Sequence, residues 1–322
     1  MNDVSVSPNR LRGVIVQNLL DEQDALPVRI FECLFTLTFL LWMGRCFLTW
    51  RDWLTDAGIH LDNNDLAAMG YPSSWPTLEP WQVLFFGAAI LIGALLLLWP
   101  KQVTSTLGLP RQILKRPAPT WARRAGLMIL FGCALYAQRV DYMAAFTLNK
   151  LYVGVFGILT VAPGMRLYAE TGRLLQSVSL LRVLQATLML QYFAAGLAKM
   201  DGDWIKSGDV LWGQVQGVYR TELAAWALRH LPLWNWTVQQ YLSLFFEVTA
   251  PLLFAIQRLR PIAFVLGIGF HLVIALLMKD LIFFSTQMWT FYALFITAEE
   301  WRAIGRKVMK GSRFTQSKHS MG

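Results

Sequence analysis

Long apolar runs separated by short polar stretches repeat along this chain between residues 30 and 298. An α-helix needs about 20 predominantly apolar residues to cross the hydrocarbon layer of a bilayer. Apolar windows bounded by charged residues, Pro or Gly predict eight such helices, over residues 30–50, 81–99, 122–142, 146–165, 180–200, 237–256, 261–278 and 281–298. We therefore expect an all-α fold, a polytopic integral membrane helical bundle of about eight transmembrane helices.

The two ends of the chain differ from this central region. Residues 1–29 are charged and mixed and lack the order of a cleavable signal peptide, although apolar residues recur there at helical spacing. That spacing suits a short helix on the membrane surface or one docked on the bundle. We expect 1–29 to be a cytoplasmic or interfacial segment, 30–298 to be the transmembrane domain and 299–322 to be a basic cytoplasmic tail.

Composition and charge support the same class of protein. Hydrophobic residues make up 55% of the 322 residues, charged residues only 15%, and mean hydropathy is +0.42. Basic residues gather in 100–124, 166–182, the turn near 258–260 and the tail, whereas 51–80 and 201–236 are rich in acids. Because basic loops stay on the cytoplasmic side, both chain ends are expected there.

The net charge of +9 is then explained by topology and by anionic lipid head groups. Membrane lipids are the expected partners, and nucleic acid is not, because the basic residues are spread over four separate loops. The four histidines are scattered without metal-ligand spacing, so no metal is expected. A phosphate-binding glycine loop and a nucleophile elbow are also absent from the sequence, which argues against nucleotide-driven transport and ordinary hydrolysis.

The fifth predicted helix carries polar residues at regular spacing. Gln185, Tyr192 and Lys199 stand seven residues apart on one helical face, and Gly196 allows close approach of another helix. Lys199 lies near the outer end, where it either snorkels to the surface or acts as a base. Trp204 follows, as an interfacial belt residue or a ligand contact.

Two later helices each bury an ionisable residue. Glu247 lies midway through the sixth predicted helix and His271 midway through the seventh. A lone charge at that depth is costly to insert, so we expect the two to form a buried pair that Gln287 of the eighth helix could join. This network either stabilises the packing of the helices or forms part of a functional site.

Asn149 and Lys150 open the fourth predicted helix near its outer end. They should therefore lie at about the depth of Lys199. If the fourth and fifth helices are adjacent, two amines share one pocket at the outer face. That condition depends on helix adjacency, which the sequence does not reveal.

The run Tyr192-Phe193-Ala-Ala-Gly196-Leu-Ala-Lys199-Met-Asp201-Gly-Asp203-Trp204 resembles the YF-x-AG-x-x-K-x-D-x-DW segment of vitamin K-dependent gamma-carboxylase. Phe245-Phe246-Glu247-Val248 and Phe270-His271 are similar to later elements of that family, and Asn149 with Leu151 and Tyr152 resembles its NHSYL element. Together these pieces cover about 146–298. The whole chain resembles the eight-helix HTTM domain shared with bacterial homologues.

The resemblance implies a chemistry. In the family, the lysine matching Lys199 deprotonates a reduced vitamin K, and the oxygenated product removes a proton from a peptide glutamate that then takes up carbon dioxide. Lys199 would be the base, with Asn149, Lys150 and His271 as further catalytic residues. The expected substrate-binding residues are Gln185, Tyr192, Trp204, Glu247 and Gln287. The cofactor would be a reduced vitamin K or menaquinone-type quinol.

Two departures from the family pattern accompany this resemblance. Lys150 stands where the family has a histidine, and the sequence ends soon after the eighth predicted helix, without the large lumenal region of the animal enzyme.

Three functions therefore stand side by side. The first is an enzyme-like site at the outer face of a bacterial inner membrane, a gamma-carboxylase-like lyase or epoxidase that acts on a quinone or modifies an exported peptide. The second is a non-carboxylating maturation or immunity factor for a secreted peptide, resembling the SdpB group. The third is a lipid or small-molecule binding or transport protein.

Overall fold

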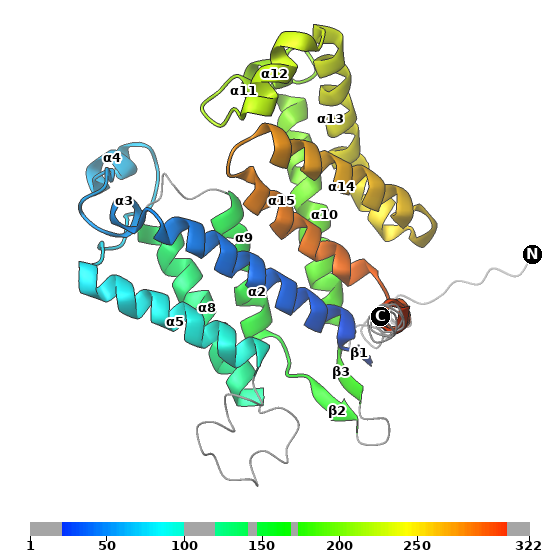
Figure 1. Cartoon of the computed structure of the whole chain (residues 1–322). Coiled ribbons are helices and arrows are strands. Elements are labelled where there is room, and N and C mark those ends of the chain that lie inside the picture. Colours follow the sequence, from blue (N-terminus) through cyan, green and yellow to red (C-terminus); the bar gives the residue numbers. More distant parts are fainter. Residues whose placement is uncertain (1–20, 100–119, 141–146, 169–172, 308–322) are drawn as a thin grey trace, which may run out of the picture.

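The computed structural model describes residues 21–99, 120–140, 147–168 and 173–307 (Figure 1). Within these residues, every predicted apolar segment is largely helical. The long helices are α2 (Leu26–Phe47), α5 (Pro80–Leu98), α8 (Thr120–Val140), α9 (Thr147–Val161), α10 (Val178–Asp201), α13 (Leu233–Ala255), α14 (Arg260–Leu277) and α15 (Leu281–Thr290), which the 3-10 turn η2 (Phe291–Phe295) continues. Shorter elements in the connections are α3 (Trp50–Leu54), α4 (Asn63–Ala68), α11 (Val210–Val215), α12 (Glu222–His230) and η1 (Gln257–Leu259).

Local sequence explains where several of these helices begin. Helix α5 starts with Pro80 in its first turn, and Glu79 and Gln82 form a reciprocal capping box. Helix α10 starts after Ser177, whose hydroxyl accepts a hydrogen bond from the Ser179 amide. The apolar runs therefore become helices with defined starting points.

Four helices of the described chain are long and apolar enough to cross a membrane, namely Leu26–Phe47, Pro80–Leu98, Val178–Asp201 and Gln257–Leu277. A fifth candidate is the pair Leu281–Phe295 and Ala298–Lys307, which meet at an angle of 108°. Helix α9 is only 15 residues long, and polar residues lower the apolarity of α8 and α13. The fold is that of a helical membrane protein, and eight crossings stay a prediction.

A small β-sheet lies at one end of the helices, which we call the sheet end (lower right in Figure 1). It consists of β1 (Glu22–Asp24), β2 (Arg166–Tyr168) and β3 (Arg173–Ser177), in the order β1-β3-β2 and antiparallel throughout. Apart from this small sheet the described elements are helical, so the all-α class agrees with the prediction. The three strands are short segments that flank the apolar runs. Their pairing satisfies the hydrogen bonds of their backbone N–H and C=O groups.

Helices α2, α8, α10 and α14 begin at the sheet end. Arg29 of α2 donates to the carbonyl of Leu97 at the end of α5, at 3.3 Å. Gln185 of α10 donates to the carbonyl of Leu294 in η2, at 2.8 Å. Arg302, beyond η2, pairs with Asp24 of β1.

The opposite end, which we call the loop end, carries α3, α4, α11 and α12 (upper and left parts of Figure 1). Trp42 near the end of α2 meets Asn149 at the start of α9, and Thr221 before α12 donates to the carbonyl of Leu276 in α14. The long helices thus alternate in direction.

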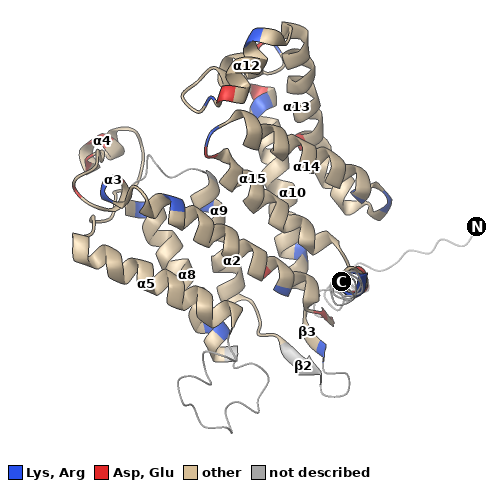
Figure 2. Ribbon diagram, in the orientation of Figure 1, with Lys and Arg blue, Asp and Glu red and all other residues tan. Residues whose placement is uncertain are grey.

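The acid-rich segments 51–80 and 201–236 lie at the loop end, and the described basic segments lie at the sheet end (Figure 2). This is the segregation that the charge pattern predicts. Which end faces the cytoplasm stays a prediction, and the predicted surface helix before residue 21 lies outside the described residues.

Helix α2 runs through the centre of the bundle and packs on both groups of helices. Its Phe35 ring lies 5.0 Å from the Tyr152 ring of α9 and 5.7 Å from the Phe291 ring of η2, between centroids. These rings are almost fully buried. Helix α2 therefore joins α5, α8 and α9 on one side to α10, α13, α14 and α15 on the other.

A buried ion cluster fixes the sheet end of α2. Glu32 is fully buried, and its carboxylate accepts from Arg29 at 2.6 Å and from the guanidinium of Arg123 in α8. Glu32 was not among the residues predicted from the sequence. The signal was available, since an acid three residues after an arginine inside an apolar run needs a partner.

Candidate functional site around Lys199

Lys199 lies in the last turn of α10, where α10 and α13 approach closely. A Cβ atom on Gly196 would lie 2.8 Å from Val248 Cγ2 and 3.0 Å from the Val248 backbone nitrogen of α13. Glycine is thus required for this spacing, as the sequence predicts. The close approach brings Lys199 Nζ to 2.6 Å from Glu247 Oε2.

The ammonium of Lys199 is also surrounded by aromatic rings. Its Nζ lies 4.4 Å from the Trp204 ring centroid and 5.6 Å from that of Phe270 in α14. Such contacts stabilise a cation electrostatically, most strongly over Trp. Lys199 therefore points inward, toward a carboxylate and two rings, and does not extend freely as a snorkelling lysine would.

Trp204 is held in place by α13. The side-chain amide of Gln240 donates to the carbonyl oxygens of Trp204, at 2.7 Å, and Ser207, at 2.6 Å. Gln240 is fully buried, and its oxygen accepts from the Leu211 amide at 3.0 Å. This single side chain thereby fastens the connection after α10 to α13. Gln240 was not predicted from the sequence, although two adjacent glutamines inside an apolar helix were a usable signal.

A cavity of about 550 Å³ opens beside Lys199, and we call it the Lys199 pocket. Its walls come from α10, α11, α13 and α14 and are mostly apolar and aromatic; they include Trp204, Leu242, Phe246, Val265, Leu266 and Phe270. Among its rim residues, Val265 is 73% exposed and Leu242 51% exposed. These exposed apolar side chains make the rim of the pocket apolar.

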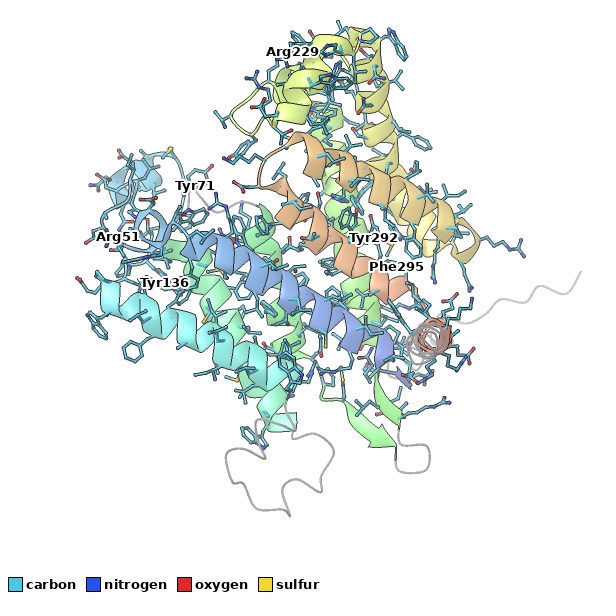
Figure 3. All side chains as sticks on the ribbon, in the orientation of Figure 1. Arg51, Tyr71, Tyr136, Arg229, Tyr292 and Phe295 are labelled. Carbon is cyan, nitrogen blue, oxygen red and sulfur yellow. The ribbon has the colours of Figure 1, made fainter. Side chains whose placement is uncertain are left out.

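Beneath this pocket lies a buried hydrogen-bonded triad. The hydroxyl of Tyr192 is 2.8 Å from His271 Nε2 and 2.8 Å from the Tyr292 hydroxyl. Figure 3 shows Tyr292 in the middle of the bundle. A Cβ atom on Gly267 would lie 2.0 Å from the Tyr292 hydroxyl, so only glycine fits there. Tyr292 was not predicted from the sequence.

The predicted pairing of Glu247 with His271 is corrected by this geometry. Glu247 pairs with Lys199, and His271 bonds to Tyr192 and, through its backbone carbonyl, to Ser285 at 2.8 Å. Position along the chain gives depth but not rotation about the helix axis. The two residues therefore share a depth and still point to different partners.

The remaining predicted residues lie away from Lys199. Asn149 is buried and accepts from Trp42 Nε1 at 2.6 Å, while Lys150 is exposed. Gln287 donates to the carbonyl of Leu148 at 3.1 Å, which ties α15 to α9. Gln185 lies about 20 Å from Lys199 along α10, at the sheet end. The structure thus joins Lys199, Trp204 and Glu247 in one site, with Tyr192 and His271 below.

Within the described residues, no group of three or more His, Cys, Asp or Glu side chains could hold a metal ion. The site offers instead one amine, one carboxylate and a set of aromatic rings. These groups can exchange a proton and bind an apolar, aromatic molecule.

Comparison with known proteins places this site in a family context. The second half of the chain is a helical membrane domain with an amine-bearing pocket. Residues 175–301 match the family model of the HTTM domain, which is associated with vitamin K-dependent carboxylase-like membrane proteins. The match runs from β3 past η2 and contains the whole Lys199 pocket. Neither a curated protein nor a solved structure matches the chain.

Proposed function

We propose that the Lys199 pocket binds a lipid-soluble quinol and that Lys199 removes a proton from its hydroxyl group. The observation that carries the proposal is the placement of one amine, paired with a carboxylate, at the edge of an apolar aromatic cavity. The cavity volume falls within the range of about 300–1,000 Å³ usual for small-molecule sites. The proposed cofactor is a reduced vitamin K or menaquinone-type quinol.

Lys199 and Glu247 can divide the proton work between them. When the shared proton lies on Glu247, the amine has a free lone pair and can act as a base. Lys199 would then accept the hydroxyl proton of a bound quinol on its amine and become an ammonium. Trp204 and Phe270 stabilise that ammonium, and they can also stack on a flat ring.

The pocket walls support binding of this substrate class. Aromatic residues line the cavity from α13, from α14 and from the connection after α10, which carries Trp204. A lipid-facing rim would let a membrane-dissolved molecule reach Lys199 without crossing water. Quinol activation in the manner of gamma-carboxylase, followed by modification of an exported peptide at the outer face of an inner membrane, extends the proposal along the family resemblance. Asn149, Lys150 and His271 would then act from outside the immediate pocket.

A binding or transport role is the second candidate. The observation that favours it is the ion pair itself, since an ammonium that is paired with Glu247 and stacked on Trp204 can anchor a ligand without giving up its proton. The maturation or immunity role for a secreted peptide, resembling the SdpB group, also needs binding but not base chemistry.

The test compares molecules that co-purify with the wild type and with Lys199→Ala, using mass spectrometry on extracted quinones and peptides. Lys206→Ala is the matched control. Lys206 lies in the connection that follows α10, its side chain is exposed, and its Nζ is as far as 3.9 Å from the Asp203 carboxylate. We expect a quinone with the wild type and the control, and at least a tenfold lower amount with Lys199→Ala. Equal quinone in all three samples would contradict the proposed site, and a peptide in place of a quinone would favour the maturation role.

A further inference from the structure

A second cavity, of about 390 Å³, lies at the loop end between α2, α3 and the turn from α14 to α15. We call it the Arg45 pocket. Its apolar wall is formed by Trp42, Trp53, Leu148, Leu281 and Phe284. Its polar groups are Arg45, Lys279, Asp280, Thr49 and Tyr219. The cavity therefore combines an apolar, largely aromatic wall with two basic side chains and one acidic side chain.

The Arg45 pocket is separate from the Lys199 pocket, and the two have no lining residue in common. The His271 ring lies between residues of the two walls. Its centroid is 5.0 Å from the ring of Phe270, which lines the Lys199 pocket, and 5.5 Å from the ring of Phe284, which lines the Arg45 pocket. A ligand of one pocket therefore does not occupy the other.

Arg45 is only partly used by its ion pair. Its Nε lies 3.3 Å from Asp280 Oδ1 and its Nη2 lies 3.4 Å from Oδ2, both long for a charge-assisted hydrogen bond. A guanidinium has five N–H donors, and within the described residues these two contacts engage only two of its nitrogens. The Arg45 side chain is 34% exposed. It can therefore bind a further anion without leaving Asp280.

The turn that carries Asp280 points both of its charged residues toward the pocket. Asp280 has a φ of +63°, and the Lys279 amide donates to the Tyr219 carbonyl at 2.5 Å. A left-handed residue other than glycine is uncommon and is often found at ligand sites. Lys279 is exposed and adds a second positive charge at the rim.

We infer that the Arg45 pocket binds an anionic amphiphile, in which a carboxylate or phosphate head is joined to an apolar body. Arg45 and Lys279 would bind the head, and the wall of Trp42, Trp53 and Phe284 would bind the body. The charge balance of the pocket, two cations to one acid, favours an anion over a neutral lipid. The position at the ends of the helices suits a molecule that rests partly in the interface and partly in the bundle.

The experiment uses three photoreactive, alkyne-tagged probes with the purified full chain in nanodiscs, namely a diazirine fatty acid, its methyl ester and a diazirine phosphatidic acid. Labelled peptides are mapped by mass spectrometry, and apparent affinity is obtained by competition with the unlabelled compound. We expect one or both acidic probes to label the residues around Trp42 and Phe284 at least tenfold more strongly than the ester. Preference for the fatty acid identifies a free carboxylate, and preference for the phosphatidic acid identifies a lipid head group.

Two variants should change the affinity in opposite directions. Arg45→Gln removes the anchoring cation and should weaken binding of the acidic probe about tenfold or more. Asp280→Asn removes the competing acid, retains a residue that tolerates the left-handed backbone, and should strengthen binding severalfold. Thermal unfolding of each variant verifies that the fold is retained, and Asp280→Asn carries the test alone if Arg45→Gln does not fold.

Arg51→Gln is the matched control. Arg51 lies on the neighbouring helix α3 (labelled in Figure 3), is exposed, and stacks over Trp50 at 5.3 Å without lining the pocket. The Arg51→Gln substitution should leave labelling by the acidic probes unchanged. Equal labelling by the acid and its methyl ester, or no opposite response of Arg45→Gln and Asp280→Asn, would overturn the inference.

Discussion

Two buried carboxylates lie on apolar helices of this protein, one at each end of the bundle, and their surroundings differ. Glu32 at the sheet end is enclosed by two arginines, Arg29 and Arg123. Glu247 pairs with one lysine at the loop end, and a cavity of about 550 Å³ opens beside that lysine. Arginine does not lose its proton in proteins, whereas lysine can. The first cluster can only hold helices together, and the second can also transfer a proton.

The largest expected effect is on stability at the sheet end. Glu32→Gln should leave Arg29 and Arg123 without their counter-charge. The loss is costly because these arginine side chains are only 20% and 12% exposed. Breaking a buried pair in this way costs about 3–5 kcal/mol. Thermal unfolding in detergent measures the loss. Quinone retention by the folded fraction should be unchanged. A Glu32→Gln variant that is stable but loses quinone would contradict a purely structural role for the Glu32 cluster.

The next effect concerns the approach of α10 to α13. Gly196→Ala places a methyl group against Val248 and should lower the free energy of unfolding by about 1–3 kcal/mol, as overpacking does. It should also separate Lys199 from Glu247 and reduce quinone retention. Gly154→Ala in α9 is the control, since nothing lies within 4 Å of the added Cβ. If both variants behave alike, close packing is not what builds the site.

A smaller effect is expected within the buried triad. Tyr192→Phe removes the hydroxyl that bonds to both His271 and Tyr292. Hydrogen bonds between helices in membranes contribute about 0.6 kcal/mol on average and up to about 1.7 kcal/mol. A double-mutant cycle of Tyr192→Phe with Tyr292→Phe, followed by thermal unfolding, should show a coupling of that size. Strict additivity would mean that the hydroxyls do not share a bond.

The smallest expected coupling is that between Glu247 and His271, and the contacting pair Lys199 and Glu247 serves as its comparison. Lys199→Gln and Glu247→Gln should be strongly non-additive, because the residues contact each other at 2.6 Å. Glu247→Gln and His271→Ala should add to within about 0.5 kcal/mol, because Glu247 pairs with Lys199 and His271 bonds to Tyr192. The readout is again unfolding in detergent. A large coupling between Glu247 and His271 would restore the pairing that the sequence pattern favoured.

The sequence predicted the helices better than their contacts. Apolar runs of bilayer length identify each long helix locally, and Gly196 correctly marked a close approach. The partner of Glu247 could not be obtained in this way, because it depends on which helices are adjacent and how each is rotated. The same limit applies to Asn149, which shares the loop end with Lys199 but contacts Trp42.

Several residues that the sequence singled out do lie together, and their catalytic and substrate-binding roles stay predictions. Lys199, Trp204 and Glu247 do come together, and the signal was the spacing of polar residues in apolar helices. Gln240 and Tyr292 were missed because a single glutamine or tyrosine in an apolar run has several ordinary explanations. The short sheet was missed because strands of three to five residues leave little periodicity to detect.

The most direct test of the central claim is the activity of Lys199→Arg toward a reduced menaquinone, followed as loss of the quinol and formation of its oxidised products by liquid chromatography and mass spectrometry. Arginine keeps the positive charge near Glu247 and Trp204 but cannot serve as a base near neutral pH. We expect normal expression and folding with activity lower by about 100-fold or more. A fully active Lys199→Arg variant would contradict it and leave Lys199 with a binding or structural role.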